Sequence, residues 1–189
     1  MDAGLAKVIN STIGTDSFKP LDKLLYGRQG LVPSDNAYFN ISNFEANRVT
    51  VTTAQTNASA YSEGTIIRLK MWTDGGFKIG ASVKYGCETS GNWTSSVSGG
   101  IAIFVNGVLV KKGIGSHYGE LNGTLNADVK TDAIYFSTDD IVEIKSYVSG
   151  NRTTSGSGNV TFFGEINTSN PIVIYADSVE KPFDILRAE

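Results

Sequence analysis

The chain has very little of the residues on which covalent and metal chemistry usually depends. Its 189 residues include one cysteine, Cys87, and one histidine, His117. A single cysteine cannot form a disulfide within the chain, and this pair cannot supply a set of zinc ligands. We therefore expect Cys87 to be a buried structural thiol, and we expect neither a metal nor another cofactor.

The sequence also lacks the features of membrane and nucleic-acid-binding proteins. No apolar run approaches the roughly 20 residues of a membrane span, and Met1-Asp2-Ala3 does not open a signal peptide. Lys and Arg number 16 against 19 Asp and Glu, whereas phosphate binding favours clustered basic residues. We expect no nucleic-acid partner, no membrane insertion, and folding in a cytosol.

Motifs of common catalytic sites are missing as well. The chain contains no Gly-x-Ser-x-Gly elbow and no phosphate-binding Gly-Lys-Ser/Thr loop. The acidic pairs Asp139-Asp140, and Asp74 with Glu63, form a glycosidase pair only if folding brings them together. Aspartates at turns ordinarily make local hydrogen bonds. We predict that the protein is not an enzyme.

Alternation with a period of two dominates from about residue 36 onward. Phe77, Ile79, Ala81, Val83 and Tyr85 alternate with polar or small residues, which is typical of a half-buried strand. Asn106-Gly107 favours a type I′ hairpin turn, and Asp74-Gly75-Gly76 predicts another hairpin before Phe77. The pattern predicts an all-β sandwich of about nine or ten antiparallel strands.

The first residues follow a different pattern. Leu5, Val8, Ile9 and Ile13 have helical spacing, and Pro20 fits the first turn of a second short helix. We predict a helical attachment segment at 1–33 and a β-sandwich head at 34–189.

Three marks in the second half of the chain occur in a recognisable order. They are Phe104-Val105-Asn106-Gly107, then Ile134-Tyr135-Phe136 followed by Asp139-Asp140-Ile141-Val142-Glu143-Ile144, then Thr161-Phe162-Phe163-Gly164. Together they resemble the closing half of the jelly roll shared by complement globular heads and tumour necrosis factor. The resemblance covers about residues 36–166 and implies a jelly-roll sandwich that assembles as a homotrimer.

Aromatic residues are the candidates for the trimer interface. Phe163 points opposite to Phe162, and Tyr135 opposite to Phe136, so one ring of each pair faces away from its own core. Phe104 is the third candidate. Aromatic side chains commonly anchor such interfaces. The alternative is that these rings pack under loops of their own chain.

The N-terminal segment resembles the opening of small virion proteins of tailed bacteriophages. The resemblance implies a receptor-binding or fibre head that assembles in the host cytoplasm, with its N-terminal segment joined to other virion proteins. A virion decoration protein without a ligand, and a bacterial adhesive or signalling jelly roll, are the alternatives.

The candidate ligand-binding residues lie in polar segments between strands. Trp93 lies in a stretch rich in Ser, Gly and Asn, a composition typical of adaptable polar contacts around a rigid aromatic ring. A sugar of a host surface glycan, or a surface protein, would stack on Trp93 and bond to Asn92 and Thr94. His117 and Tyr118 form a second candidate site. Alternatively, Trp93 packs against the head or between subunits.

Overall fold

The computed structural model describes residues 37–45, 47–53, 58–61, 66–89, 94–152, 159–176 and 180–186. Within these ranges every regular element is a β-strand, and the strands form two antiparallel sheets. The all-β prediction is confirmed. The helical segment predicted at 1–33 lies outside the described residues. The described part of the chain holds no helix that is long and apolar enough to cross a membrane.

The larger sheet, sheet A, has seven strands. They are β1 (Ala37–Ile41), β2 (Val49–Thr53), β5 (Gly75–Thr89), β8 (Gly123–Lys130), β9 (Ile134–Phe136), β11 (Val160–Ile166) and β12 (Ile172–Ala176). The long β5 is its central strand, because it pairs with β11 and β12 along one side and with β8 and β9 along the other.

The smaller sheet, sheet B, has six strands. They are β3 (Ala58–Tyr61), β4 (Ile67–Met71), β6 (Thr94–Val105), β7 (Val108–Glu120), β10 (Ile141–Arg152) and β13 (Phe183–Leu186). The described residues thus form more strands than the nine or ten predicted. The difference comes partly from β3, β9 and β13, which have only 4, 3 and 4 residues and are too short for a clear alternation.

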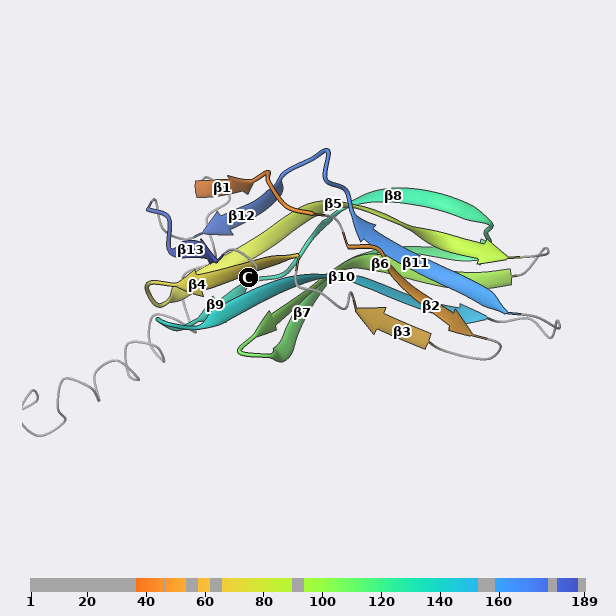
Figure 1. Ribbon diagram of the computed structural model, residues 1–189, viewed down its shortest axis with the longest axis horizontal. Helices are drawn as coiled ribbons and strands as arrows, with labels where there is room; N and C mark the ends of the chain where they lie inside the picture. Colours follow the sequence, from red (N-terminus) through yellow and green to blue (C-terminus); the bar gives the residue numbers. More distant parts are fainter. Residues whose placement is uncertain are drawn as a thin grey trace, which may run out of the picture.

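Four strand pairs nest inside one another, as in one long hairpin that is rolled up (Figure 1). From the inside outward they are β6 with β7, β5 with β8, β4 with β10, and β2 with β11. Successive pairs alternate between sheet B and sheet A, which is the winding of a jelly roll. The partners lie at nearly equal distances along the chain from Asn106-Gly107: Val97 pairs with His117, Gly80 with Lys130, Ile67 with Ile144, and Val49 with Gly164.

The tip of this nested hairpin has the predicted turn. Asn106 and Gly107 both have positive φ, at 50° and 79°, as a type I′ turn requires. Asn and Gly adopt this left-handed region more readily than other residues. The Asn-Gly hairpin prediction is therefore confirmed.

The predicted hairpin at Asp74-Gly75-Gly76 is wrong. The strand before it, β4, belongs to sheet B, whereas β5 belongs to sheet A, so the turn carries the chain across the sandwich. Gly75 and Gly76 already pair with Phe136 and Tyr135 of β9. The local turn residues predict a change of direction, but they do not specify which strand the chain meets next.

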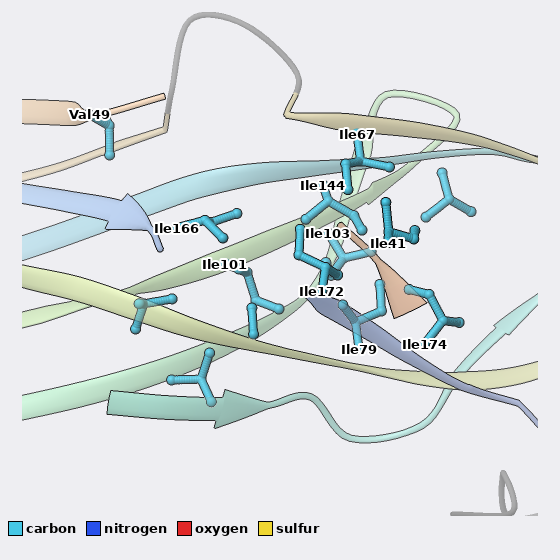
Figure 2. Packing of buried hydrophobic residues seen from close by; sticks show 14 of the residues in the cluster. Ile41, Val49, Ile67, Ile79, Ile101, Ile103, Ile144, Ile166, Ile172 and Ile174 are labelled. Atoms are coloured by element: carbon cyan, nitrogen blue, oxygen red, sulfur yellow. The ribbon is translucent and has the colours of Figure 1, made fainter. Parts of the chain in front are cut away.

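The core lies between the two sheets and is largely aliphatic. Figure 2 shows Ile79, Ile172 and Ile174 of sheet A packed with Ile103 and Ile144 of sheet B, and all five are 0% exposed. The alternation predicted for residues 77–85 is confirmed, because its apolar members are buried and its lysines are not. Cys87 is also 0% exposed, and its Sγ donates to the backbone oxygen of Leu121 at 2.7 Å. The buried-thiol prediction is confirmed.

Close packing of the sheets yields a stability prediction at Gly150. A Cβ added there would lie 2.2 Å from Cδ2 of Phe162, whose ring is fully buried. We expect Gly150→Ala to lower the free energy of unfolding by about 1–3 kcal/mol, because the buried ring has to move. Urea denaturation followed by tryptophan fluorescence measures the change.

Ser149→Ala is the matched control, because Ser149 lies one residue away on the opposite face of β10. We expect it to change the free energy of unfolding by less than about 0.5 kcal/mol. Equal stability of the two variants would contradict the packing argument.

Candidate functional site

A polar pocket lies on the outer face of sheet B, over β3, β6 and β10. Val97 and Val148 point into the core, so the residues beside them in these strands point outward. The pocket has a volume of about 330 Å³ and is lined by Ser59, Ser96, Ser98, Tyr147, Ser149, Gly150 and Asn151. We call it the serine pocket. All of its lining side chains are uncharged at neutral pH.

The strand register explains why the sheet is hollowed at this point. Ser59 pairs with Ser149, Ser149 with Ser98, and Ser98 with Ser116. Opposite side chains on one face lie about 5 Å apart, so these serines form a row across four strands. The hydroxyls of Ser98 and Ser116 are 2.8 Å apart. A row of small side chains leaves the sheet surface lower than its surroundings.

Larger residues lie on both sides of this serine row. On one side Asn151 pairs with Ser96, and Ser96 pairs with Tyr118, which is 81% exposed. On the other side the ring of Tyr147 is buried, with Lys112 Nζ 4.2 Å from its centroid. The pocket therefore has an exposed aromatic ring near one side and a covered ring at the other.

One polar atom at the pocket lacks a hydrogen bond. Asn151 Oδ1 is buried and has no donor among the described residues. A buried acceptor without a donor costs about 1–3 kcal/mol. A hydroxyl that donated to this oxygen would remove that cost.

The aspartates considered as catalytic candidates lie at turns and bind neighbouring groups. Asp74 Oδ1 accepts hydrogen bonds from the backbone N–H and the hydroxyl of Thr138, at 2.8 and 3.2 Å. Asp139 forms an exposed ion pair with Lys70 at 3.0 Å and has a φ of 68°. Glu63 lies outside the described residues. Folding thus brings Asp74 to the Asp139-Asp140 turn, where its carboxylate serves that turn.

Asp140 links this turn to the tip of the nested hairpin. Its Oδ1 accepts from Asn106 Nδ2 at 2.8 Å, and its Oδ2 accepts from the N–H of Ser137 at 2.6 Å. Asn106 Oδ1 in turn accepts from the N–H of Ile141 at 2.9 Å.

In the described part of the chain, no three His, Cys, Asp or Glu side chains are placed to hold a metal ion. These turns therefore have a structural role, and the absence of enzyme activity stays a prediction.

Of the residues predicted to bind a ligand, the structure describes the side chains of His117 and Tyr118. Asn92 and Trp93 lie outside the described residues, in the segment that joins β5 to β6, and β6 begins at Thr94. His117 pairs with Val97 on the core side of sheet B and is half-buried. Tyr118 lies on the outer face, beside the serine pocket. His117 and Tyr118 therefore do not line one site, and of these two residues Tyr118 is the one beside the serine pocket.

The predicted interface aromatics have different surroundings. Phe163 is only 4% exposed, because the Arg48 guanidinium lies 4.1 Å from its ring centroid. Phe104 is half-buried, with Lys145 Nζ 4.7 Å from its centroid. Tyr135 is 44% exposed. Phe163 thus packs under its own chain, which was the alternative, while Tyr135 keeps an accessible ring.

Sequence reasoning missed the serine pocket. Ser96 and Ser98 alternate with core residues of β6, and Ser149 and Asn151 alternate with core-side residues of β10. Such alternation predicts an outward face for each strand, but it gives no indication that the outward faces of β6 and β10 lie side by side. The signal that was available is the absence of a large side chain at these outward positions.

Comparisons with known proteins leave the family of this chain open. No protein-family model and no curated protein matches the sequence. Among solved structures, the Eiger TNF of S. frugiperda has 7% identity and a TM-score of 0.37, over 70% of this chain and 91% of that one. An arabinose-bound GH51 α-L-arabinofuranosidase has 11% identity and a TM-score of 0.35, over 78% of this chain and 25% of that one. Likenesses of this size carry no argument about function.

The hydrogen bonds that Asp140 accepts predict that this residue stabilises the fold. We expect Asp140→Ala to lower the free energy of unfolding by about 1–3 kcal/mol, because two donors lose their acceptor. Urea denaturation measures this loss.

Asp139→Asn is the control, because it removes only an exposed ion pair and keeps a residue type that tolerates positive φ. We expect a change below about 1 kcal/mol. If Asp140→Ala were as stable as Asp139→Asn, the structural role assigned to Asp140 would be wrong.

Proposed function

We propose that this protein is a non-catalytic binding head that attaches to a neutral surface glycan through the serine pocket. The observation that carries this proposal is the row of outward serines across β3, β10, β6 and β7, flanked by Asn151 and Tyr118. These residues combine many hydrogen-bonding groups with no charge.

The chemistry of the pocket fits a ligand rich in hydroxyl groups. Each serine hydroxyl both donates and accepts hydrogen bonds, and an asparagine amide does the same with separate atoms. Sugar hydroxyls have the same dual character. The unpartnered Asn151 Oδ1 is an acceptor that a sugar hydroxyl would satisfy. An anionic ligand is disfavoured, because none of the described residues that line the pocket is Lys or Arg.

Tyr118 supplies the apolar part of such a site. Its ring is 81% exposed and stands on the strand next to Ser96, on the same face as the pocket. Aromatic rings with a polar end are suited to contacts that are partly apolar and partly wet. We propose that one sugar ring packs on Tyr118 while its neighbour occupies the pocket.

The proposal also includes the place of this chain in a larger assembly. The chain would be a homotrimeric receptor-binding or fibre head of a phage virion, with residues 1–33 joined to other virion proteins. The support is the order of the sequence motifs and the resemblance of the N-terminal segment. Trivalent display can raise avidity by a factor of roughly 10² to 10⁴ over one weak site. A decoration protein without a ligand is the alternative.

A glycan array with the purified chain tests the proposal. We expect binding to neutral glycans, and we expect Ser149→Leu to weaken it at least about tenfold, because a leucine at the centre of the row fills the pocket. Asn126→Leu is the matched control, because Asn126 is exposed on β8 of sheet A. It should bind as the wild type does.

Trp93→Ala tests the site predicted from the sequence. Loss of binding in Trp93→Ala with full binding in Ser149→Leu would move the site from the pocket to the segment before β6. No binding to any glycan or host cell by the wild type would refute the attachment role and leave the decoration protein.

A further inference from the structure

A second row of residues crosses the outer face of sheet B next to the serine row. Asn151 of β10 pairs with Ser96 of β6, and Ser96 pairs with Tyr118 of β7. The β-bulge between β6 and β7 lies at Ile103/Phe104, near the other end of these strands, so the pairing at Ser96 is regular. The row therefore sets an amide, a hydroxyl and an aromatic ring side by side. We call it the asparagine row.

The middle of the asparagine row is low, and its two ends are chemically different. Directly opposite residues share a face and lie about 5 Å apart, so Asn151 and Tyr118 stand about 10 Å apart with the small Ser96 between them. Asn151 ends the row with hydrogen-bonding groups, and Tyr118 ends it with a ring that is 81% exposed. A ligand group that lies along this row thus needs a polar end and an apolar end.

The unpartnered oxygen of Asn151 favours an amide N–H over a hydroxyl. Asn151 Oδ1 is buried and has no hydrogen-bond donor among the described residues. A hydroxyl that donated to it would bring two lone pairs into a buried position, and these would need donors in turn, whereas an amide N–H only donates. Asn151 as a whole is half-buried and lines the pocket. The torsion that rotates its amide is soft, so a small rotation turns the oxygen toward a bound ligand.

We propose that the serine pocket selects sugars that carry an acetamido group, and that this group lies along the asparagine row. The inference rests on the glycan-binding function proposed above. In a trans amide the N–H and the methyl group lie on the same edge, so the N–H donates to Asn151 Oδ1 while the methyl packs against Tyr118. The small Ser96 between them leaves room for the amide plane.

The other edge of the acetamido group carries the carbonyl oxygen and the sugar ring. With the N–H and the methyl turned to the asparagine row, this edge faces the serine row. There Ser98 and Ser149 offer hydroxyls to the carbonyl oxygen and to the hydroxyls of the sugar. The exposed ring of Tyr118 is large enough to contact this methyl and also the next sugar unit. A plain hydroxyl in place of the acetamido group would leave the Tyr118 end of the row unused.

Matched oligosaccharides separate this inference from the proposed function. They differ only in an acetamido group or a hydroxyl at one carbon, as N-acetylglucosamine differs from glucose and N-acetylgalactosamine from galactose. On a glycan array with the full chain, we expect at least one N-acetylated member to bind at least about fivefold more tightly than its parent, because it adds a hydrogen bond and a methyl contact. Parents that bind as tightly as their N-acetylated partners would overturn the inference and leave the proposed function standing. No binding to any glycan would refute both.

An ester analogue tests the hydrogen bond to Asn151. An O-acetyl group keeps the carbonyl and the methyl but has an oxygen in place of the N–H, so the wild type should bind it at least about fivefold more weakly than the N-acetyl form. Asn151→Ala should remove this difference, whereas Asn151→Asp keeps an acceptor oxygen and should retain it. Asn126→Ala, at an exposed position on β8, is the matched control and should also retain it. A difference that persists in Asn151→Ala would overturn the role of Asn151.

Saturation-transfer NMR locates the methyl group of the bound sugar. In the wild type we expect the acetyl methyl protons to receive the largest saturation, and in Tyr118→Ala we expect them to lose most of it. Ile114→Ala is the matched control, because Ile114 lies on the same face of β7 and is 50% exposed, but on the far side of the serine row. It should leave the methyl signal unchanged. Equal saturation of the methyl in the wild type and in Tyr118→Ala would overturn the proposed contact.

Discussion

The turn at Asn106-Gly107 is the constraint around which the strand pairs of the sandwich are arranged. Four strand pairs nest around it, and the partners in each pair lie nearly equally far from it along the chain. Asn106 Nδ2 donates to Asp140, and Asn106 Oδ1 accepts from the N–H of Ile141, so these two hydrogen bonds fix the tip against the start of β10. The strand β10 belongs to the β4–β10 pair, which lies in the same sheet as the hairpin.

The same register produces both the core and the pocket. Along β6 and β10, one face supplies the isoleucines and valines between the sheets, and the other supplies Ser98 and Ser149. The small outward residues do not weaken the core, because they do not contribute to it. Core packing and the proposed recognition of a ligand thus fall on opposite faces of the same strands, while the acidic turns serve the scaffold.

Much of this fold was predictable from the sequence, because strand alternation and the Asn-Gly turn are local signals. The alternation of residues 77–85 predicted a half-buried strand. The Asn106-Gly107 pair predicted the type I′ turn between β6 and β7. Asp74-Gly75-Gly76 was misread, because a turn does not encode the partner of the strand that follows it. The serine pocket was not predictable, since Ser59, Ser98, Ser116 and Ser149 are distant in the chain and only the register aligns them. Trp93 and Asn92 lie outside the described residues and stay predictions.

The nesting of strand pairs also bears on how such a chain folds. Sandwiches are dominated by contacts between residues far apart in sequence, and the entropy of closing long loops slows their folding. In this chain the outer pairs need not close long loops from the open chain. Once β6 and β7 have paired, only the short segments 90–93 and 121–122 separate β5 and β8 from the pair already formed. The topology thus favours zippering outward from one hairpin, at a low entropic cost for each added pair.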